Sequence, residues 1–179
     1  MQLTLTSCVV RSFRIADAKP LARHADNRKI WLNLRDAFPH PYTLGDARDF
    51  ITSLHGRTPE TAFAIDIGGE AAGVVGFVLR HDVERVSAEI GYWLAEPFWG
   101  RGIATEALGA MTAHAIATHK LTRVYAVPFA WNTASCRVLE KNGYVLEARL
   151  RRSAIKDGVI TDQLQYAFVV PEPAAEAAG

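Results

Sequence analysis

The segment that most limits the fold is residues 96–111, EPFWGRGIATEALGAM, where two glycines and an arginine stand directly before a helical pattern. From Ile103 the apolar residues recur every three or four positions, which predicts a helix of about 17 residues with one buried face. Residues 85–94 before it, RVSAEIGYWL, have the pattern of a strand. A strand, a glycine turn and a buried helix in direct succession predict a mixed α/β domain.

The rest of the chain continues this alternation and predicts one domain over residues 1–170. The expected strands are residues 8–14, 61–67, 71–80, 85–94, 123–129, 144–152 and 159–169. The expected helices, besides the one from Ile103, are residues 16–26, 28–35, 44–54 and 133–142. Their ends carry recognisable turn and cap residues: a Gly68-Gly69 hairpin turn, a Thr43–Asp46 capping box, and Asn132 as an N-cap. The predicted fold class is α+β, with a largely antiparallel mixed sheet of about six to seven strands flanked by helices. The tail, residues 171–179, has little to bury and is predicted to be disordered.

Charge and composition exclude several classes of protein. A net charge of +1 provides no field to hold nucleic acid. The longest nearly apolar stretch, residues 71–79, is far shorter than the roughly 20 residues of a membrane span, and the first charge is Arg11, so the start lacks the basic region of a secretion signal. We therefore expect a cytoplasmic protein, a monomer or homodimer, without nucleic-acid or membrane partners.

Cysteine and histidine spacing gives no indication of a metal site. Cys8 and Cys136 lie far apart, without the spacing of a disulfide framework or a zinc site, and we expect both to be packing residues. His114 and His119 are not at the four-residue separation that aligns two ligands on a helix, and we expect them to be solvated.

The glycines before Ile103 admit two interpretations. The first amides of a helix have no partner within the helix, and the helix dipole adds partial positive charge there, so bare backbone at this point suits a phosphate or pyrophosphate. Arg101 would add a cation. Alternatively, the glycines merely turn the chain. The pattern is neither GxxxxGK[ST] nor GxGxxG, so a P-loop and a dinucleotide-binding turn are excluded.

Three motifs, in matching order, resemble one family. YWLAEPFWGRGIATEAL resembles the acetyl-CoA-binding motif of the GNAT acetyltransferases, and WNTASCRVLEKNGY resembles its companion segment downstream. PYTLGDARDFI, residues 41–51, is similar to the RimJ/RimL type, which acetylates protein amino termini. The resemblance covers roughly residues 8–170 and implies the splayed sheet of the GNAT fold.

This resemblance implies a pose for acetyl-CoA. Its pyrophosphate would lie on amides from Arg101 to Thr105, and its pantetheine would pair with backbone of Trp93 and Leu94 where two parallel strands separate. Trp99 replaces the glutamine or arginine that often opens the loop in the family. The cofactor-binding residues expected on this basis are Trp93, Leu94, Trp99, Gly100, Arg101, Gly102, Ile103, Ala104, Thr105, Asn132 and Ser135.

Transfer of an acetyl group to an amine requires a base, because amines are largely protonated at neutral pH. On the strand SAEIGYWL, Glu89, Gly91 and Trp93 share one face, and Glu89, close to what we expect to be a tightly packed Gly91, is the candidate base, acting through a water. Alternatively, Glu89 is a structural charge paired to an arginine such as Arg85.

The proton donor to the leaving thiolate has more than one candidate. The tyrosine that many relatives carry is replaced by Leu139. The RimJ/RimL resemblance implies that Ser135 serves instead, although its backbone N–H is also the natural partner of the Asn132 cap. The thiolate can also leave unassisted, since a thiol has a pKa of about 8.5.

These features predict an enzyme that transfers the acetyl group of acetyl-CoA to a primary amine, with a protein or peptide N terminus as the favoured acceptor. The alternatives are a small-molecule amine acetyltransferase and a non-catalytic acyl-CoA-binding domain. Asp162 could orient the acceptor or serve a turn. Six aromatic residues could line the acceptor pocket or pack in the core: Trp31, Phe38, Tyr42, Trp93, Phe129 and Trp131.

Overall fold

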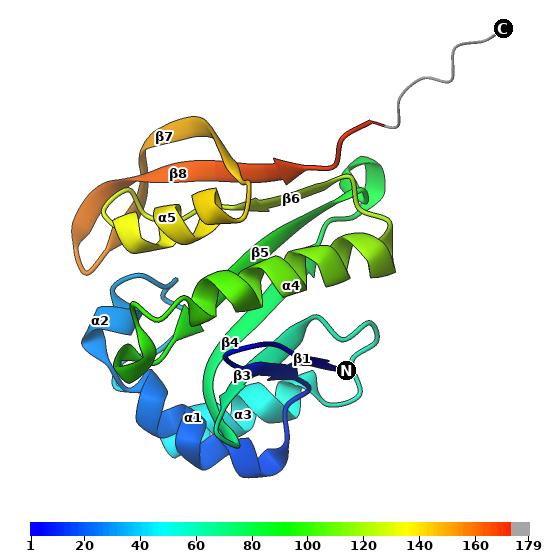
Figure 1. Ribbon diagram of the computed structural model, residues 1–179. Coiled ribbons are helices and arrows are strands. Elements are labelled where there is room, and N and C mark those ends of the chain that lie inside the picture. The colour runs from blue at the N-terminus through cyan, green and yellow to red at the C-terminus, as the bar shows by residue number, and fades with distance from the viewer. Residues whose placement is uncertain (173–179) are drawn as a thin grey trace, which may run out of the picture.

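The computed structural model describes residues 1–172 (Figure 1). Its strands are β1 (Gln2–Thr4), β2 (Val9–Arg11), β3 (Ala62–Ile67), β4 (Glu70–Leu79), β5 (Ser87–Leu94), β6 (Arg123–Ala126), β7 (Val145–Lys156) and β8 (Val159–Val169). Its helices are η1 (Ile15–Asp17), α1 (Ala18–Ala25), α2 (Arg28–Trp31), α3 (Leu44–Leu54), η2 (Asp82–Glu84), η3 (Glu96–Phe98), α4 (Ile103–His119) and α5 (Thr133–Lys141). Most of the predicted disordered tail, residues 173–179, lies outside the described residues.

The strands form one sheet in the order β1-β2-β3-β4-β5-β6-β8-β7. Among the described strands all neighbours are antiparallel except β5 and β6, which are parallel. This confirms the predicted mixed, largely antiparallel fold, with eight strands rather than six to seven. The additional strand is β1, and both β1 and β2 span three residues, which is too short for alternation to mark their ends.

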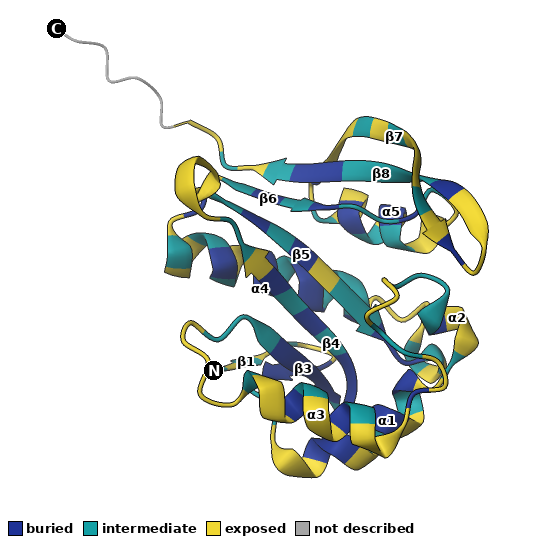
Figure 2. Cartoon of the chain, turned by 180° about the vertical axis from the view of Figure 1, so that it is seen from behind, coloured by how far each residue is buried: buried dark blue, intermediate teal, exposed yellow. Residues whose placement is uncertain are grey.

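Helices cover both faces of this sheet. Figures 1 and 2, seen from opposite sides, show α4 and α5 on one face and α1 and α3 on the other. The first face holds the larger core, in which Ala107, Leu108, Met111 and Ala115 of α4 are buried as predicted. The smaller core, between α1, α3 and the sheet, includes Leu21, Ala47 and Ile51. The helix from Ile103 therefore starts at the glycines and buries one face from Ile103 to Ala115.

Capping residues set the ends of two helices. The Thr43 hydroxyl accepts a bond from Asp46 N, and the Asp46 carboxylate accepts one from Thr43 N, so the predicted capping box of α3 is confirmed. Leu44, expected on the buried side, is 38% exposed because it lies in the first turn at the edge of the core. At α5, Asn132 Oδ1 accepts from Ser135 N at 3.1 Å.

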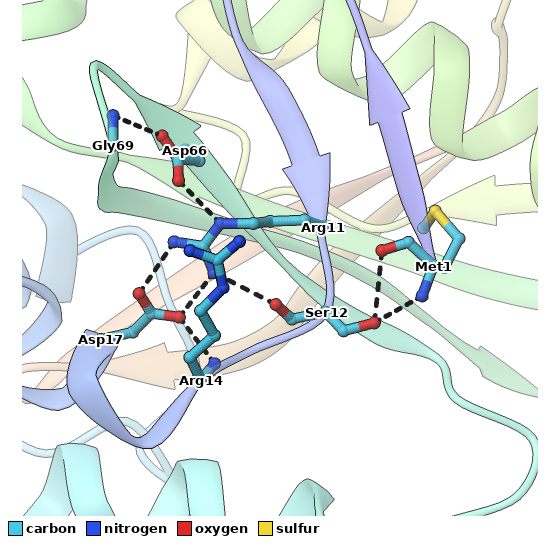
Figure 3. Close-up of polar contacts among 7 residues, drawn as sticks. All are labelled: Met1, Arg11, Ser12, Arg14, Asp17, Asp66 and Gly69. Atoms are coloured by element: carbon cyan, nitrogen blue, oxygen red, sulfur yellow. Dashed lines mark hydrogen bonds and ion pairs between the residues drawn. The ribbon is translucent and has the colours of Figure 1, made fainter.

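A buried arginine connects β2 with two other parts of the chain (Figure 3). Arg11 donates to both oxygens of Asp17 at 2.7 and 2.8 Å and to Asp66 at 2.7 Å. Asp66 Oδ1 in turn accepts from Gly69 N in the β3–β4 turn. Burial alone would raise the pKa of Asp17, but hydrogen bonds from Arg11 and from Arg14 N outweigh it and hold that pKa below its usual value. The sequence pattern did not indicate this network, because its partners lie up to 55 residues apart.

Candidate active site

The glycine loop before α4 presents open backbone. Gly100 and Gly102 have φ values of 74° and 79°, a region that side chains disfavour, and Gly102 is the N-cap of α4. Within residues 1–172 the amides of Ile103, Ala104 and Thr105 donate to no acceptor. A Cβ atom on either glycine would meet nothing within 4 Å. The glycines therefore both turn the chain and leave a helix N terminus open to an anion.

Next to this loop, β5 and β6 separate. Their pairing ends at Glu89 and Tyr125, whereas β5 continues to Leu94. Ala95 N donates to Ala72 O of β4, so by alternation the backbone groups of Trp93 also face β4, and those of Tyr92 and Leu94 face the gap. This corrects the expectation for Trp93, whose backbone is engaged in the ladder. Leu94 O accepts from the indole of Trp99 at 2.7 Å, so Trp99 ties the glycine loop to the strand end.

A cavity of about 390 Å³ runs from the glycine loop into this gap. Leu94, Trp99, Gly100, Gly102, Ile103, Ala104 and Thr105 line it, as expected. Three basic residues that were not predicted from the sequence also line it: Lys29, Arg137 and Lys141. Arg137 and Lys141 stand one turn apart on α5, a spacing that could have indicated them. Arg101, the predicted cation, lies with its guanidinium 5.6 Å from the ring centre of Phe98.

A second cavity, of about 990 Å³, lies on the other side of β5. Of the six aromatic candidates, Phe38, Tyr42, Trp93 and Phe129 line it. Trp31 and Trp131 pack outside it, against His40 and Phe129. The two cavities share the residues Asn33, Leu34, Tyr92, Trp93, Asn132 and Ser135. A molecule in the smaller cavity can therefore meet one in the larger cavity beside Tyr92 and Ser135.

The backbone and the hydroxyl of Ser135 have different partners. Its backbone N–H is held by the Asn132 side chain, while its hydroxyl lies 2.8 Å from that of Tyr92 on β5. Tyr92 was missed by sequence reasoning because it belongs to a different element 43 residues away. Burial raises the pKa of Tyr92, so its phenol keeps its proton at neutral pH.

Glu89 lines the larger cavity only, with its side chain 17% exposed. Its Oε1 accepts from Arg35 and its Oε2 from Arg80 at 3.0 Å. Arg80 also donates to the hydroxyl of Tyr125 at 2.6 Å. The expected alternative of an arginine pair is thus realised with different partners, because Arg85 turns to Asp82 O instead. Glu89 and Tyr92 are three residues, about 10 Å, apart and on opposite faces of β5, so Glu89 can reach the junction only through an intermediary.

The wall shared by both cavities is held by the β7–β8 hairpin. Lys156, 1% exposed, lies 3.8 Å from the ring centre of Trp31 and 2.8 Å from Asp36. Arg28 pairs with Asp157 at the tip of the hairpin. The hairpin thus holds α2 through Arg28 and the segment after it through Asp36, and Asn33 and Leu34, which line both cavities, lie between these two contacts.

Comparison with known proteins identifies the family to which this site belongs. Residues 8–145 match the acetyltransferase (GNAT) domain family. The chain belongs to the GNAT acetyltransferase family. A ribosomal-protein-serine acetyltransferase of Escherichia coli (strain K12) is 30% identical over 85% of this chain and 87% of its own. A RimL ribosomal L7/L12 alpha-N-protein acetyltransferase solved with coenzyme A is 25% identical, with a TM-score of 0.82 over 95% of this chain and 98% of its own. The microcin C7 self-immunity acetyltransferase MccE, solved with acetyl-CoA and AMP, is 25% identical, with a TM-score of 0.80 over 93% and 94%.

This GNAT domain is therefore an acetyl-CoA-dependent N-acetyltransferase, and the alternative of a non-catalytic binding domain is not retained. Its residues fit acetyl-CoA: free helix amides and an open glycine loop suit the pyrophosphate, the gap beside β5 suits an extended chain, and basic residues border the cavity.

Other candidates in the GNAT domain have structural roles. Asp162 accepts from Arg149 and from Arg152 N, and so secures the irregular part of β7. His114 and His119, expected to be solvated, are partly exposed, and each also packs edge-on against an aromatic ring, Phe63 and Phe77 respectively. Cys8 and Cys136 are buried and unpaired, which confirms their packing role. Residues 1–172 contain neither a group of three metal-ligating side chains nor a helix long and apolar enough to cross a membrane.

Proposed function

We propose that this enzyme acetylates the α-amino group of a protein or peptide N terminus. The observation that carries the proposal is the larger cavity, which meets the smaller one at Tyr92 and Ser135. At about 990 Å³ it lies at the upper end of the range for small-ligand sites, so it has room for more than a single small amine. The E. coli relative, whose name describes action on ribosomal-protein serine, supports the same acceptor class.

We assign the smaller cavity to acetyl-CoA. The amides of Ile103, Ala104 and Thr105 bind the pyrophosphate, Arg137 and Lys141 neutralise phosphate charge, and backbone of Tyr92 and Leu94 orients the extended arm. When bound, acetyl-CoA supplies an activated thioester whose sulfur is a good leaving group.

The remaining chemistry falls to two side chains. Ser135, at the junction, donates a hydrogen bond to the carbonyl oxygen or a proton to the departing sulfur. Glu89 attracts the acceptor ammonium and takes its proton through a water, as its distance from the junction requires. Arg80 holds one oxygen of Glu89 from the sheet, and Arg35, whose side chain is 72% exposed, can leave the other oxygen when the acceptor arrives.

A direct test is acetyl transfer to a panel of short peptides with free N termini, peptides with a blocked N terminus and an internal lysine, and small amines. We expect transfer to the free N termini first, because an α-amine with a pKa of about 8 has more neutral form at neutral pH than lysine at about 10.4. Turnover of small amines with none of peptides would contradict the proposal.

A small-molecule acceptor is the second candidate. It is supported by the similarity to MccE, which was solved with AMP beside acetyl-CoA. The same panel separates the two acceptor classes.

A further inference from the structure

The floor of the larger cavity includes two glycines side by side. Gly76 of β4 and Gly91 of β5 are direct cross-strand partners, and both line the cavity. Their neighbours on this face are the pairs Val74–Trp93 and Val78–Glu89. A glycine inside a strand has no side chain to pack and loses more conformational entropy on folding than alanine does. Each such glycine therefore costs roughly 0.5 to 1 kcal/mol of stability relative to alanine, and its presence needs a structural or functional reason.

The structure gives such a reason for Gly76 but not for Gly91. A Cβ on Gly76 would lie 2.6 Å from Thr61 O and 3.0 Å from the Cα of Ala62, so close packing against β3 requires glycine there. Gly91 is exposed, its φ is in the ordinary range, and a Cβ would meet nothing within 4 Å. This corrects the expectation that Gly91 is tightly packed. Neither the backbone nor the packing of the protein explains Gly91.

What Gly91 does leave is empty space at a defined place. Successive residues on one face of a strand are about 7 Å apart, so the bare patch lies between the Glu89 carboxylate and the Trp93 ring. An amine whose nitrogen is drawn towards Glu89 has its next carbon over or beside this patch. A side chain at position 91 would project into the volume that a substituent on that carbon needs.

We propose that Gly91 is a specificity-determining residue that admits amines whose carbon next to the nitrogen is branched, as the Cα of a residue with a side chain is. The inference rests on the proposed function and deepens it: the acceptor class is the α-amine of a residue with a side chain, such as alanine or serine. In a lysine side chain and in N-terminal glycine that carbon is an unbranched CH2 group, so these amines do not need the space.

The test adds a methyl group to the enzyme and removes one from the acceptor. Gly91→Ala is assayed with two peptides that differ only in their first residue, alanine or glycine, and with alaninamide and glycinamide as a pair without the peptide chain. We expect the alanine-to-glycine ratio of kcat/KM to fall by about 10-fold or more relative to the wild type, because one methyl group in a filled site has about that effect. The variant should also melt at a higher temperature, since a β-strand favours alanine over glycine. Gly45→Ala, exposed in the first turn of α3 and outside the cavity, is the control and should leave the ratio unchanged.

The possible outcomes distinguish failure of the inference about Gly91 from failure of the proposed function. An unchanged ratio in Gly91→Ala overturns the inference while leaving the proposed function intact, provided that the wild type acetylates the peptides. Transfer to alaninamide but to no peptide overturns the proposed function, and the amide pair then still tests Gly91. Failure of Gly91→Ala to fold overturns the inference as well, because position 91 would then not be open.

Discussion

The hydroxyl oxygens of Tyr92 and Ser135 lie 2.8 Å apart where the two cavities meet, and the Tyr92 oxygen is also 3.2 Å from the Ser135 carbonyl oxygen. A phenol has one proton to donate. When it goes to the carbonyl, the Ser135 hydroxyl must donate to Tyr92. When it goes to Ser135 Oγ, the proton of Ser135 is free for the substrate. The donor role proposed for Ser135 therefore depends on Tyr92.

The first prediction concerns this pair. Ser135→Ala should lower kcat by about 10²-fold, the typical effect of removing one donor to a developing charge, with little recovery at high pH. Tyr92→Phe should have no further effect on kcat in the Ser135→Ala background, because it acts through Ser135. Additive losses of kcat in the double variant would show that Tyr92 acts independently.

Glu89→Gln should lower turnover by about 10² to 10⁴-fold while acetyl-CoA still raises the melting temperature. The loss should shrink as the pH rises, because the amine then arrives neutral and needs no base. Glu147→Gln removes the charge of another arginine-paired glutamate, bound to Arg123 outside both cavities, and is the matched control. Wild-type turnover of Glu89→Gln between about pH 6 and pH 9 would leave Glu89 a structural role alone.

Gly102→Glu should abolish binding of acetyl-CoA, because it introduces bulk and negative charge at the α4 amides. Acetyl-CoA at about 100 times its Kd should stabilise the wild type by roughly 2.7 kcal/mol, which thermal unfolding detects. Gly158→Glu is the control, since Gly158 also has a positive φ of 74° and open surroundings but lies in the β7–β8 turn. An equal ligand-induced shift in both variants would place the cofactor elsewhere.

Arg11→Met should destabilise the protein by about 3 to 5 kcal/mol, because it leaves two buried carboxylates without their cation. Arg23→Met, which breaks the exposed pair with Glu70, should cost about 1 kcal/mol or less. Urea unfolding of both variants measures the difference in unfolding free energy. Equal losses would show that the buried Arg11 network stabilises the protein no more than an exposed ion pair does.

The same network predicts a pH dependence. The pKa of Asp17 is lower in the folded than in the unfolded chain, so its contribution is fully present above its unfolded pKa of about 4 and is lost as the pH falls below it. The stability gap between the wild type and Arg11→Met should therefore narrow below about pH 4. A gap that is constant through this range would show that Asp17 does not depend on Arg11.

Local and periodic features were predictable from the sequence. The helix from Ile103, the Gly68-Gly69 hairpin, the Thr43 capping box and the Asn132 cap depend on neighbours within a few residues, and each is present. The predicted boundaries were wrong mainly at short elements. The strand predicted over residues 8–14 is the three-residue β2, and the helix predicted over residues 28–35 ends at Trp31. A short element lacks the two or three periods that a pattern needs.

By itself the sequence determined the glycine loop that opens α4, because glycine and cap residues impose backbone geometry locally. Its contiguous motifs also carried the family resemblance that implied the GNAT fold class and the acetyl-CoA chemistry. The tertiary structure alone decided which residues meet. Ser135 faces Tyr92, Glu89 pairs with Arg35 and Arg80 rather than Arg85, and Gly91 opens onto a cavity although the sequence suggested tight packing. The physical reason is that side-chain partners and free volume arise where strands and helices distant in the chain are brought together by burial of their apolar faces, and no local pattern encodes that register.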